Sequence, residues 1–279
     1  MIVDTALRER EATGHPIRVG MVGAGATGRA IALQLKRLSI ISLMMFLLAL
    51  PLLSGPEARA GTYTTNFPLT ENPISEGGRW INGGTVGLDW QNVRVTSNRA
   101  IGTQDGQGNY DDATAILAGT WGPNQDVSAT VYSVNPQDVP IYHEVELRLR
   151  TTITAHSITG YEVLFQAMTT GRNYVQIVRW NGPLGNFTYL ADVNPAARGI
   201  TTGSVVRATI VGNLITAYID GVQVAQATDS RFTTGSPGIG FFLDGPTSGQ
   251  GNYGFTSITA SDGVDLVPPS PPKNPRIVP

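Results

Sequence analysis

The chain has 279 residues, no cysteine, 33 glycines, 18 prolines and a formal net charge of −2. The lack of cysteine excludes disulfide scaffolds, thiolate metal sites and cysteine nucleophiles. The near-neutral charge argues against a nucleic-acid partner, because a nucleic-acid-binding domain carries a basic stripe. Abundant glycine with frequent Thr, Val and Ile predicts short strands and tight turns rather than helices.

Residues 1–37 contain a glycine-rich turn in a strand–turn–helix setting. The turn Gly23-Ala-Gly25-Ala-Thr-Gly28 follows the apolar run Ile17–Val22 and precedes a helical stretch. The segment resembles the opening of a Rossmann dehydrogenase of the homoserine-dehydrogenase type. A dinucleotide site also needs an acidic residue about 20 positions after the turn, where this chain has the uncharged run Ile40–Leu53. We therefore expect no NAD binding and interpret residues 1–37 as a vestigial fragment from a mis-start or fusion.

Residues 38–60 have the features of a secretory signal peptide. Lys36 and Arg37 precede the apolar run Ile40–Leu53, and the small-residue site Ala58-Arg-Ala60 follows it. The run is shorter than the roughly 20 residues that a membrane-spanning helix needs. The pattern predicts a secreted, periplasmic or cell-surface protein that meets the membrane only through its export signal.

Residues 61–265 read as an all-β domain, followed by a Pro-rich tail over 266–279. Short β-rich runs alternate with turns rich in Gly, Asn, Asp and Pro; the clearest are Val127–Val134, Tyr142–Thr152, Tyr161–Ala167, Tyr174–Trp180, Val205–Val211, Leu214–Ile219, Gly238–Leu243 and Tyr253–Ala260. Two-residue turns at Gly212-Asn213 and Asp220-Gly221 predict a three-stranded antiparallel meander from Val205 to Val224.

A family resemblance rests on this meander and on the residues around it. The segment Thr209–Val222 is preceded by Gly160-Tyr-Glu-Val163 and followed by Asp229, Phe232, Gly235, Gly238, Ile239 and Gly240. Residues from about 120 to 262 resemble bacterial concanavalin A-like, laminin-G-like jelly rolls. The resemblance implies a two-sheet antiparallel β-sandwich, which hosts lectins, glycan hydrolases, lyases and inert spacers alike.

Alternation along the strands predicts which side chains share a face. In Tyr142–Thr152, the apolar Val145, Leu147 and Leu149 point to the core, and Glu144, Glu146, Arg148 and Arg150 point away from it. A sheet face with aromatic, amide and charged groups suits a polysaccharide or other glycan ligand. The predicted binding residues are Arg148, Gln166, Tyr174, Gln176, Trp180 and Tyr218.

The same face also permits a catalytic interpretation. Glu144, Glu146 and Glu162 are candidate catalytic carboxylates of a glycoside hydrolase or polysaccharide lyase. Laminarinase-type jelly rolls carry E-x-D-x-x-E on one strand, whereas Glu144-Val-Glu146-Leu-Arg-Leu149 has leucine at the last position. For Glu and Arg in alternation on one strand, a solvated ladder of ion pairs is the favoured interpretation. Non-catalytic glycan binding, an enzyme and a structural or adhesion module of the cell envelope therefore stay open.

Further candidate residues lie in loops and at strand edges. Structural calcium has weak candidate ligands in Asp105, Asp111 and Asp112, with Asp262 as a second site, although ordinary turn chemistry also explains these residues. His143 shares the Val145 side of its strand and is expected to be buried, whereas His156 is expected to be exposed. Three tryptophans are interpreted as partly buried edge residues or as platforms for a sugar ring: Trp80, Trp90 and Trp121.

Overall fold

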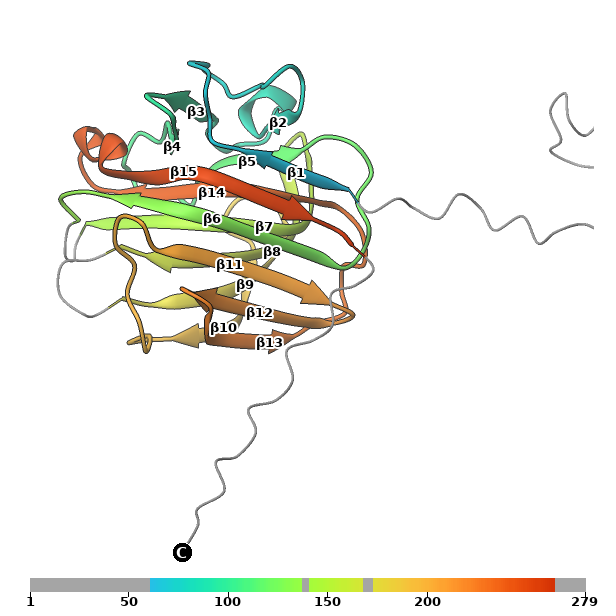
Figure 1. The fold of residues 1–279 in the computed structure, drawn as a ribbon. Helices are drawn as coiled ribbons and strands as arrows, with labels where there is room; N and C mark the ends of the chain where they lie inside the picture. Colours follow the sequence, from blue (N-terminus) through green and yellow to red (C-terminus); the bar gives the residue numbers. More distant parts are fainter. Residues whose placement is uncertain (1–60, 137–140, 168–172, 264–279) are drawn as a thin grey trace, which may run out of the picture. The chain divides into compact units, whose positions relative to one another are not determined.

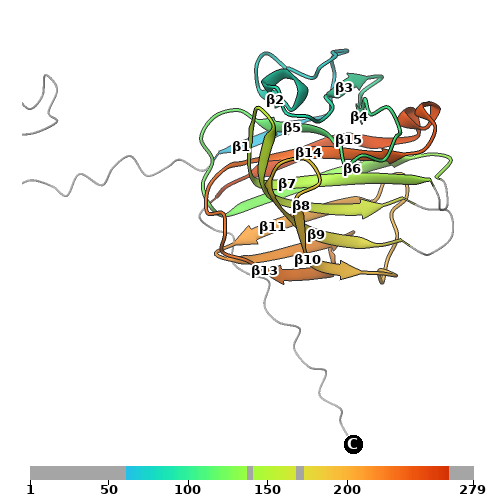
Figure 2. The same ribbon diagram turned by 180° about the vertical axis from the view of Figure 1, so that it is seen from behind.

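The computed structural model describes residues 61–136, 141–167 and 173–263. These residues form two antiparallel sheets that pack face to face (Figures 1 and 2). The predicted two-sheet antiparallel jelly-roll sandwich is thereby confirmed. The Rossmann-like segment 1–37, the signal peptide 38–60 and the tail 266–279 lie outside the described residues.

One sheet has eight strands and the other has seven. The larger sheet has the order β13 (Val222–Thr228), β12 (Leu214–Ile219), β11 (Val205–Val211), β6 (Gln125–Ser133), β15 (Tyr253–Ser261), β4 (Arg99–Gly102) and β3 (Val93–Thr96), and β1 (Thr62–Thr65) pairs with β15. The smaller sheet has the order β10 (Phe187–Val193), β9 (Val175–Gly182), β8 (Ser157–Gln166), β7 (Tyr142–Thr154), β14 (Ser236–Asp244), β5 (Ala113–Leu117) and β2 (Trp80–Asn82). Two short 3-10 helices, η1 (Gly84–Val86) and η2 (Thr247–Asn252), complete the described elements. The meander predicted from Val205 to Val224 is confirmed by the pairing of β11, β12 and β13.

The main core lies between the inner faces of the two sheets. Val145, Leu147 and Leu149 of β7 are fully buried there, as the alternation predicted. Neighbouring strands add inner-face residues in the same register, such as Val163 on β8 and Ile239 on β14. Burial of alternate apolar positions on facing sheets is the principal stabilising term of a sandwich.

A second, smaller apolar cluster covers part of the outer face of the seven-stranded sheet. Leu88 and Trp90, from the segment between β2 and β3, pack with Val178 and Trp180 of β9 in this cluster. The sheet is therefore buried on both faces at this end. The prediction that Glu146 and Arg148 belong to a solvated ladder is wrong, because both side chains have 0% exposure.

Arg150 departs from the predicted alternation because β7 contains an irregularity. The pairing of β7 with β8 shifts register between Leu149 and Thr152, and Arg150 adopts a positive φ of 46°. A bulge of this kind redirects the side chain. The Arg150 guanidinium donates to the carbonyl oxygens of Pro123, Phe232 and Gly212 instead of joining Arg148.

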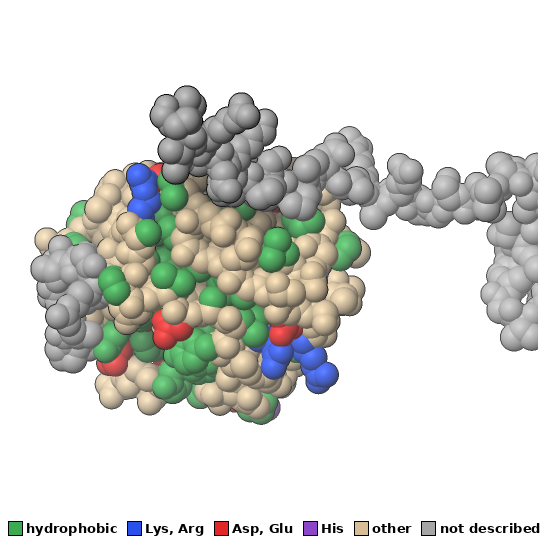
Figure 3. Space-filling view, turned by 90° about the horizontal axis from the view of Figure 1, so that it is seen from below, with side chains coloured by type: hydrophobic (Ala, Val, Ile, Leu, Met, Phe, Trp, Pro, Cys, Tyr) green, Lys and Arg blue, Asp and Glu red, His purple; other side chains and the backbone are tan. Residues whose placement is uncertain are grey.

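The face around the edge strands β10 and β13 is sparsely charged (Figure 3). The view from below, around the edge strands β10 and β13, shows scattered acidic and basic side chains among hydrophobic and uncharged polar ones (Figure 3). Within the described part of the chain, no helix combines the length and the apolar character needed to cross a membrane. Trp121 is partly buried, as interpreted, whereas Trp80 and Trp90 are more deeply buried than expected, at 5% and 3% exposure.

The two histidines of the described domain occupy the predicted environments. His143 is 1% exposed and stacks on the ring of Tyr253, with a centroid separation of 4.6 Å. His156 is exposed and pairs with Asp89 at 2.7 Å. Burial lowers the pKa of His143 from 6.5 to about 4, because an apolar setting disfavours the imidazolium.

We predict that the free energy of unfolding of His143→Phe changes less with pH in the acid range than that of the wild type. Between about pH 6.5 and pH 4, the unfolded chain binds a proton at this histidine that the folded chain does not. The free energy of unfolding of the wild type therefore falls across this window, and the variant loses less. Urea unfolding at several pH values measures the slope, with His156→Gln as the exposed control. Identical slopes for the wild type and His143→Phe would show that folding does not lower the pKa of this histidine.

Candidate ligand-binding pocket

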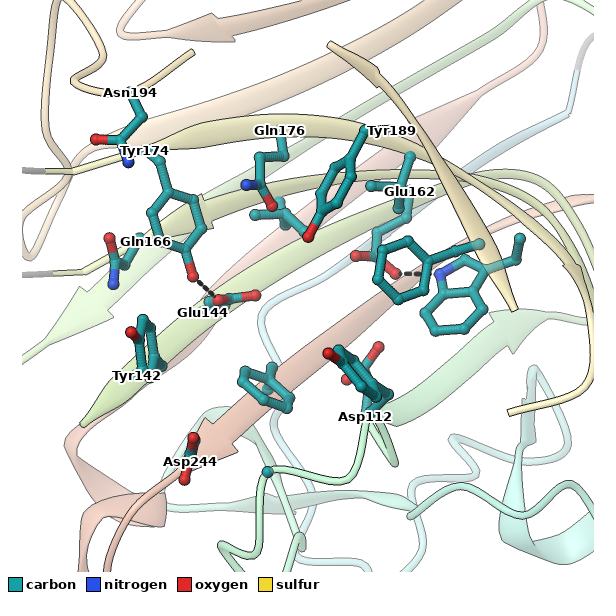
Figure 4. A pocket seen from close by; sticks show the side chains of 17 residues that line it. Asp112, Tyr142, Glu144, Glu162, Gln166, Tyr174, Gln176, Tyr189, Asn194 and Asp244 are labelled. Atoms are coloured by element: carbon teal, nitrogen blue, oxygen red, sulfur yellow. Dashed lines mark hydrogen bonds between the residues drawn. The ribbon is translucent and has the colours of Figure 1, made fainter. Parts of the chain in front are cut away.

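A pocket of about 520 Å³ opens on the outer face of the seven-stranded sheet. It is lined by outer-face side chains of β7, β8, β9, β10 and β14, together with the loop before β5 (Figure 4). The lining combines four carboxylates, three side-chain amides and seven aromatic rings. The carboxylates are Asp112, Glu144, Glu162 and Asp244; the amides are Gln166, Gln176 and Asn194; the rings are Tyr110, Tyr142, Tyr174, Trp180, Phe187, Tyr189 and Phe242.

The structure brings most of the predicted site residues together. Six of the nine candidate catalytic and glycan-binding residues line the pocket: Glu144, Glu162, Gln166, Tyr174, Gln176 and Trp180. The calcium candidate Asp112 lines it as well. Glu146 and Arg148 are fully buried and are not among the lining residues. Tyr218 is on β12 of the other sheet, where the Arg207 guanidinium lies 5.1 Å from its ring, so its prediction as part of the same surface is wrong.

The buried Arg148 organises the acidic residues beside the pocket. Its guanidinium donates to Glu162 and Glu146, to Thr114 at 3.0 Å, and to Asp112 at 3.5 Å. The ring of Trp90 lies 5.0 Å from the guanidinium carbon. The Glu162 carboxylate also accepts the indole N–H of Trp180 at 2.7 Å. These contacts fix the loop before β5 to strands β7, β8 and β9.

Gly240 provides the space that this cluster needs. It pairs with Glu146 across β14 and β7. A Cβ atom at Gly240 would overlap the Glu146 carboxylate and would lie only 2.7 Å from a guanidinium nitrogen of Arg148. Any side chain at Gly240 would therefore push the ion cluster out of position.

The cluster has more carboxylates than cations. Burial raises the pKa of Asp112, Glu144 and Glu146 well above the usual carboxyl range, and the surrounding negative charges add to the shift. Burial opposes the charge on Arg148, but the charges of Glu162, Glu146 and Asp112 outweigh it and raise the pKa of the guanidinium. Arg148 therefore stays charged, while the excess carboxyls gain affinity for protons or for an added cation.

One end of the pocket is polar. Glu144 accepts a hydrogen bond from the hydroxyl of Tyr174, which lies just before β9. Gln166 is 1% exposed and lines the pocket, and both polar atoms of its amide lack a partner among the described residues. A buried amide without partners costs free energy. A ligand hydroxyl or amine at this position would relieve that cost.

The other end of the pocket is aromatic. The rings of Trp90 and Trp180 pack edge to face, with their centroids 4.3 Å apart. The centroid of the Phe187 ring lies 5.0 Å from that of Trp180. Tyr110 and Tyr189 flank Phe187 with centroid distances of 5.4 Å and 5.2 Å. Tyr110 and Tyr189 are 50% and 54% exposed, so their rings are accessible to a ligand.

The three loop candidates for calcium, Asp105, Asp111 and Asp112, have separate partners, and so does Asp262, the second candidate site. Asp105 is exposed and accepts the backbone N–H of Gln107, as in an ordinary turn, and Asp111 accepts from Gln91. Asp262 accepts the backbone N–H groups of Gly61 and Gly122, where it ties β1 to the end of β15. Asp112 forms an ion pair with Arg148.

A group of three acids with oxygens within 4.8 Å of one another occurs at Asp112, Glu146 and Glu162. The guanidinium of Arg148 contacts all three carboxylates. Because the Arg148 guanidinium already binds each of these carboxylates, they do not form an open set of calcium ligands.

Sequence reasoning missed several residues of the pocket. Tyr142 shares the outer face of β7 with Glu144, and alternation alone could have found it. Asp244 pairs with Tyr142 across β14 and β7, so finding it required the strand register. Tyr110, Phe187 and Tyr189 come from a loop and from an edge strand, and only the packing reveals their place.

No known protein family matches the sequence, and neither does any curated protein. Among solved structures, similar folds include the carbohydrate-binding module CBM66 from Bacillus subtilis, at 16% identity and a TM-score of 0.42, covering 68% of this chain and 96% of that one. The metal-free carbohydrate recognition domain of Emp46p is similar at 15% identity and a TM-score of 0.46, with 72% and 97% covered.

The β-porphyranase BpGH16B from the human gut bacterium Bacteroides plebeius is similar at 7% identity and a TM-score of 0.40, with 72% of this chain and 92% of that one covered. These similarities concern the fold and say nothing about ligand or activity. The finer resemblance to laminin-G-like domains stays a prediction.

We predict that Arg148→Met destabilises the fold strongly at neutral pH. Removal of the cation leaves buried carboxylates without compensation, which costs about 3–5 kcal/mol. The loss should be smaller at pH 5, because burial raises the pKa values of Asp112 and Glu146 and a lower pH therefore favours their neutral forms. Urea unfolding at pH 7 and pH 5 measures both effects.

The matched control is Arg207→Met, which removes an ion pair to Asp126 on the other sheet. That pair is partly exposed, so its loss should cost at most about 1 kcal/mol at either pH. Equal effects of the two substitutions would contradict the assigned role of Arg148.

Proposed function

We propose that this domain binds a polysaccharide or oligosaccharide in the outer-face pocket and does not cleave it. The observation that carries the proposal is the composition of that single cavity. Exposed rings at one end suit the apolar faces of pyranose units, and carboxylates and amides at the other end suit their hydroxyls. Ligand sites of this size combine apolar walls with a few fixed polar groups in the same way.

The two exposed tyrosines support a binding role. Tyr110 and Tyr189 flank Phe187 at the rim of the pocket, where their rings gain little from the protein's own packing. Burial and nearby negative charge raise the pKa of Tyr189, so its hydroxyl keeps its proton and can donate to a ligand. A ligand that covers both rings would bury apolar area now in contact with water.

The ion pairs of Arg148 favour binding over hydrolysis. Hydrolysis by the two-carboxyl mechanism needs one carboxyl as acid and a second as base or nucleophile. Glu146 is fully buried, and Glu162 is held by both Arg148 and Trp180. These two candidates thus have structural partners, so of the three predicted catalytic carboxyls only Glu144 lacks a cationic partner among the described residues. Asp244, which the sequence did not suggest as catalytic, is the other pocket carboxyl in that position.

The proposal includes a location outside the cytoplasm. The signal-peptide pattern over residues 38–60 would direct the domain to the periplasm, the cell surface or the medium. Extracellular polysaccharides are available there.

We predict that Tyr189→Ala weakens glycan binding about tenfold, which corresponds to about 1.4 kcal/mol, because it removes an exposed ring from the pocket. A glycan array with the full chain identifies ligands, and calorimetry then gives the affinities. Tyr132→Ala on the other sheet, where Tyr132 contacts Arg99, is the control and should leave affinity unchanged.

The same protein and glycans also test the two alternative functions, an enzyme and a structural or adhesion module. Release of reducing ends from the bound glycan, abolished by Glu144→Gln, would replace the binding proposal with an enzyme. Absence of binding to any glycan on the array would leave a structural or adhesion module.

A further inference from the structure

The pocket is strongly unbalanced in charge. Four carboxylates line it, and among the described lining residues there is no lysine, arginine or histidine. The nearest cation, Arg148, is fully buried and already engaged with Glu146, Glu162 and Asp112. A ligand entering this pocket therefore meets two carboxyl groups, Glu144 and Asp244, that have no cationic partner among the described residues.

We infer that the glycan this pocket takes is cationic: an amino sugar or amino-sugar oligomer with free, protonated amines. The inference rests on the proposed function and specifies its ligand class. A neutral glycan would leave Glu144 and Asp244 without a cation, and an acidic glycan would add like charge beside them.

Glu144 and Asp244 form the acidic pair toward which the amine would bind. Across the β7–β14 pairing, Tyr142 is opposite Asp244 and Glu144 is opposite Phe242. Glu144 and Asp244 are thus diagonal neighbours on the outer face, with a typical backbone separation of about 7–8 Å. An ammonium group between them could contact both carboxylates.

Aromatic rings complete the surroundings of that position. Tyr142 and Tyr174 line the same part of the pocket as Glu144, and the Tyr174 hydroxyl donates to the Glu144 carboxylate (Figure 4). An ammonium group near aromatic faces gains a cation–π attraction of about 0.5–2 kcal/mol. Carboxylates and tyrosines around one site are the combination that a sugar amine requires.

The unpartnered amide of Gln166 is an independent sign of a polar ligand at this end. It is buried and faces the pocket close to Glu144, which pairs with it across β7 and β8. Its oxygen can accept from an ammonium group and its nitrogen can donate to a neighbouring hydroxyl. A single amino-sugar unit offers both groups on adjacent carbons.

The titration of Glu144 supports the same ligand class. Burial raises its pKa, and the charges of Asp112 from the loop, Glu162 from β8 and Asp244 from β14 raise it further. A bound ammonium would lower this pKa again, so binding would expel a proton from Glu144. Affinity should therefore rise with pH from the acid side until the ligand amine loses its own proton.

Three oligomers with the same β-1,4-linked backbone test the inference on the full chain. Chitosan hexasaccharide carries free amines, chitin hexasaccharide carries acetylated amines, and cellohexaose carries hydroxyls at the same carbon. By calorimetry at pH 6 and low salt, chitosan hexasaccharide should bind at least tenfold more tightly than either of the others. The preference should shrink as salt is added.

Glu144→Gln keeps the shape of the side chain and removes its charge, so it should reduce the chitosan preference severalfold. Asp220→Asn removes one exposed carboxylate on the β12–β13 turn and should leave the preference unchanged, although it changes the net charge equally.

The outcomes distinguish the two proposals. Equal or tighter binding of the acetylated or neutral oligomer would overturn the cationic ligand and leave glycan binding intact. So would a glycan array whose hits are all neutral or acidic. An array without any hit would overturn the proposed function itself.

Discussion

The structure of the pocket depends on one buried guanidinium. Arg148 holds the carboxylates of Asp112, Glu146 and Glu162 at the outer face of the seven-stranded sheet, with Thr114 as a further acceptor. Each of these charges would be costly to bury alone, and each is stable only because the others are present. The loop before β5 is thereby tied to strands β7 and β8, and the pocket next to it acquires a fixed wall.

The same cluster divides the acids of this face into two groups. Asp112, Glu146 and Glu162 neutralise Arg148 and serve the fold, whereas Glu144 and Asp244 lack a cationic partner among the described residues. The first group contains two of the three carboxyls that the sequence suggested as catalytic, Glu146 and Glu162, and both are engaged in ion pairs. The second group lies in the pocket and is the pair to which the proposed sugar amine would bind. A face that carries Glu and Arg in alternation can thus be structural at one end and functional at the other.

Strand alternation was sufficient to predict the shared face of Glu144, Glu162, Gln166, Tyr174, Gln176 and Trp180, because the side-chain period of a strand is two and these strands are adjacent. Alternation could not predict that Leu88 and Trp90 cover this face and bury it, because that contact joins segments distant in the sequence. The bulge at Arg150 also has no signature in the local pattern. Tyr218 has the right residue type and phase, but its strand pairs with β11 and β13 in the other sheet.

Hydrogen–deuterium exchange of the full chain, with and without saturating chitosan hexasaccharide, tests the central claim most directly, because it locates the ligand without any substitution. A ligand held in the outer-face pocket should slow amide exchange in the loop before β5 and in strands β9 and β10. Protection confined to the eight-stranded sheet, for example to β11 and β12, would contradict the assignment of the binding site.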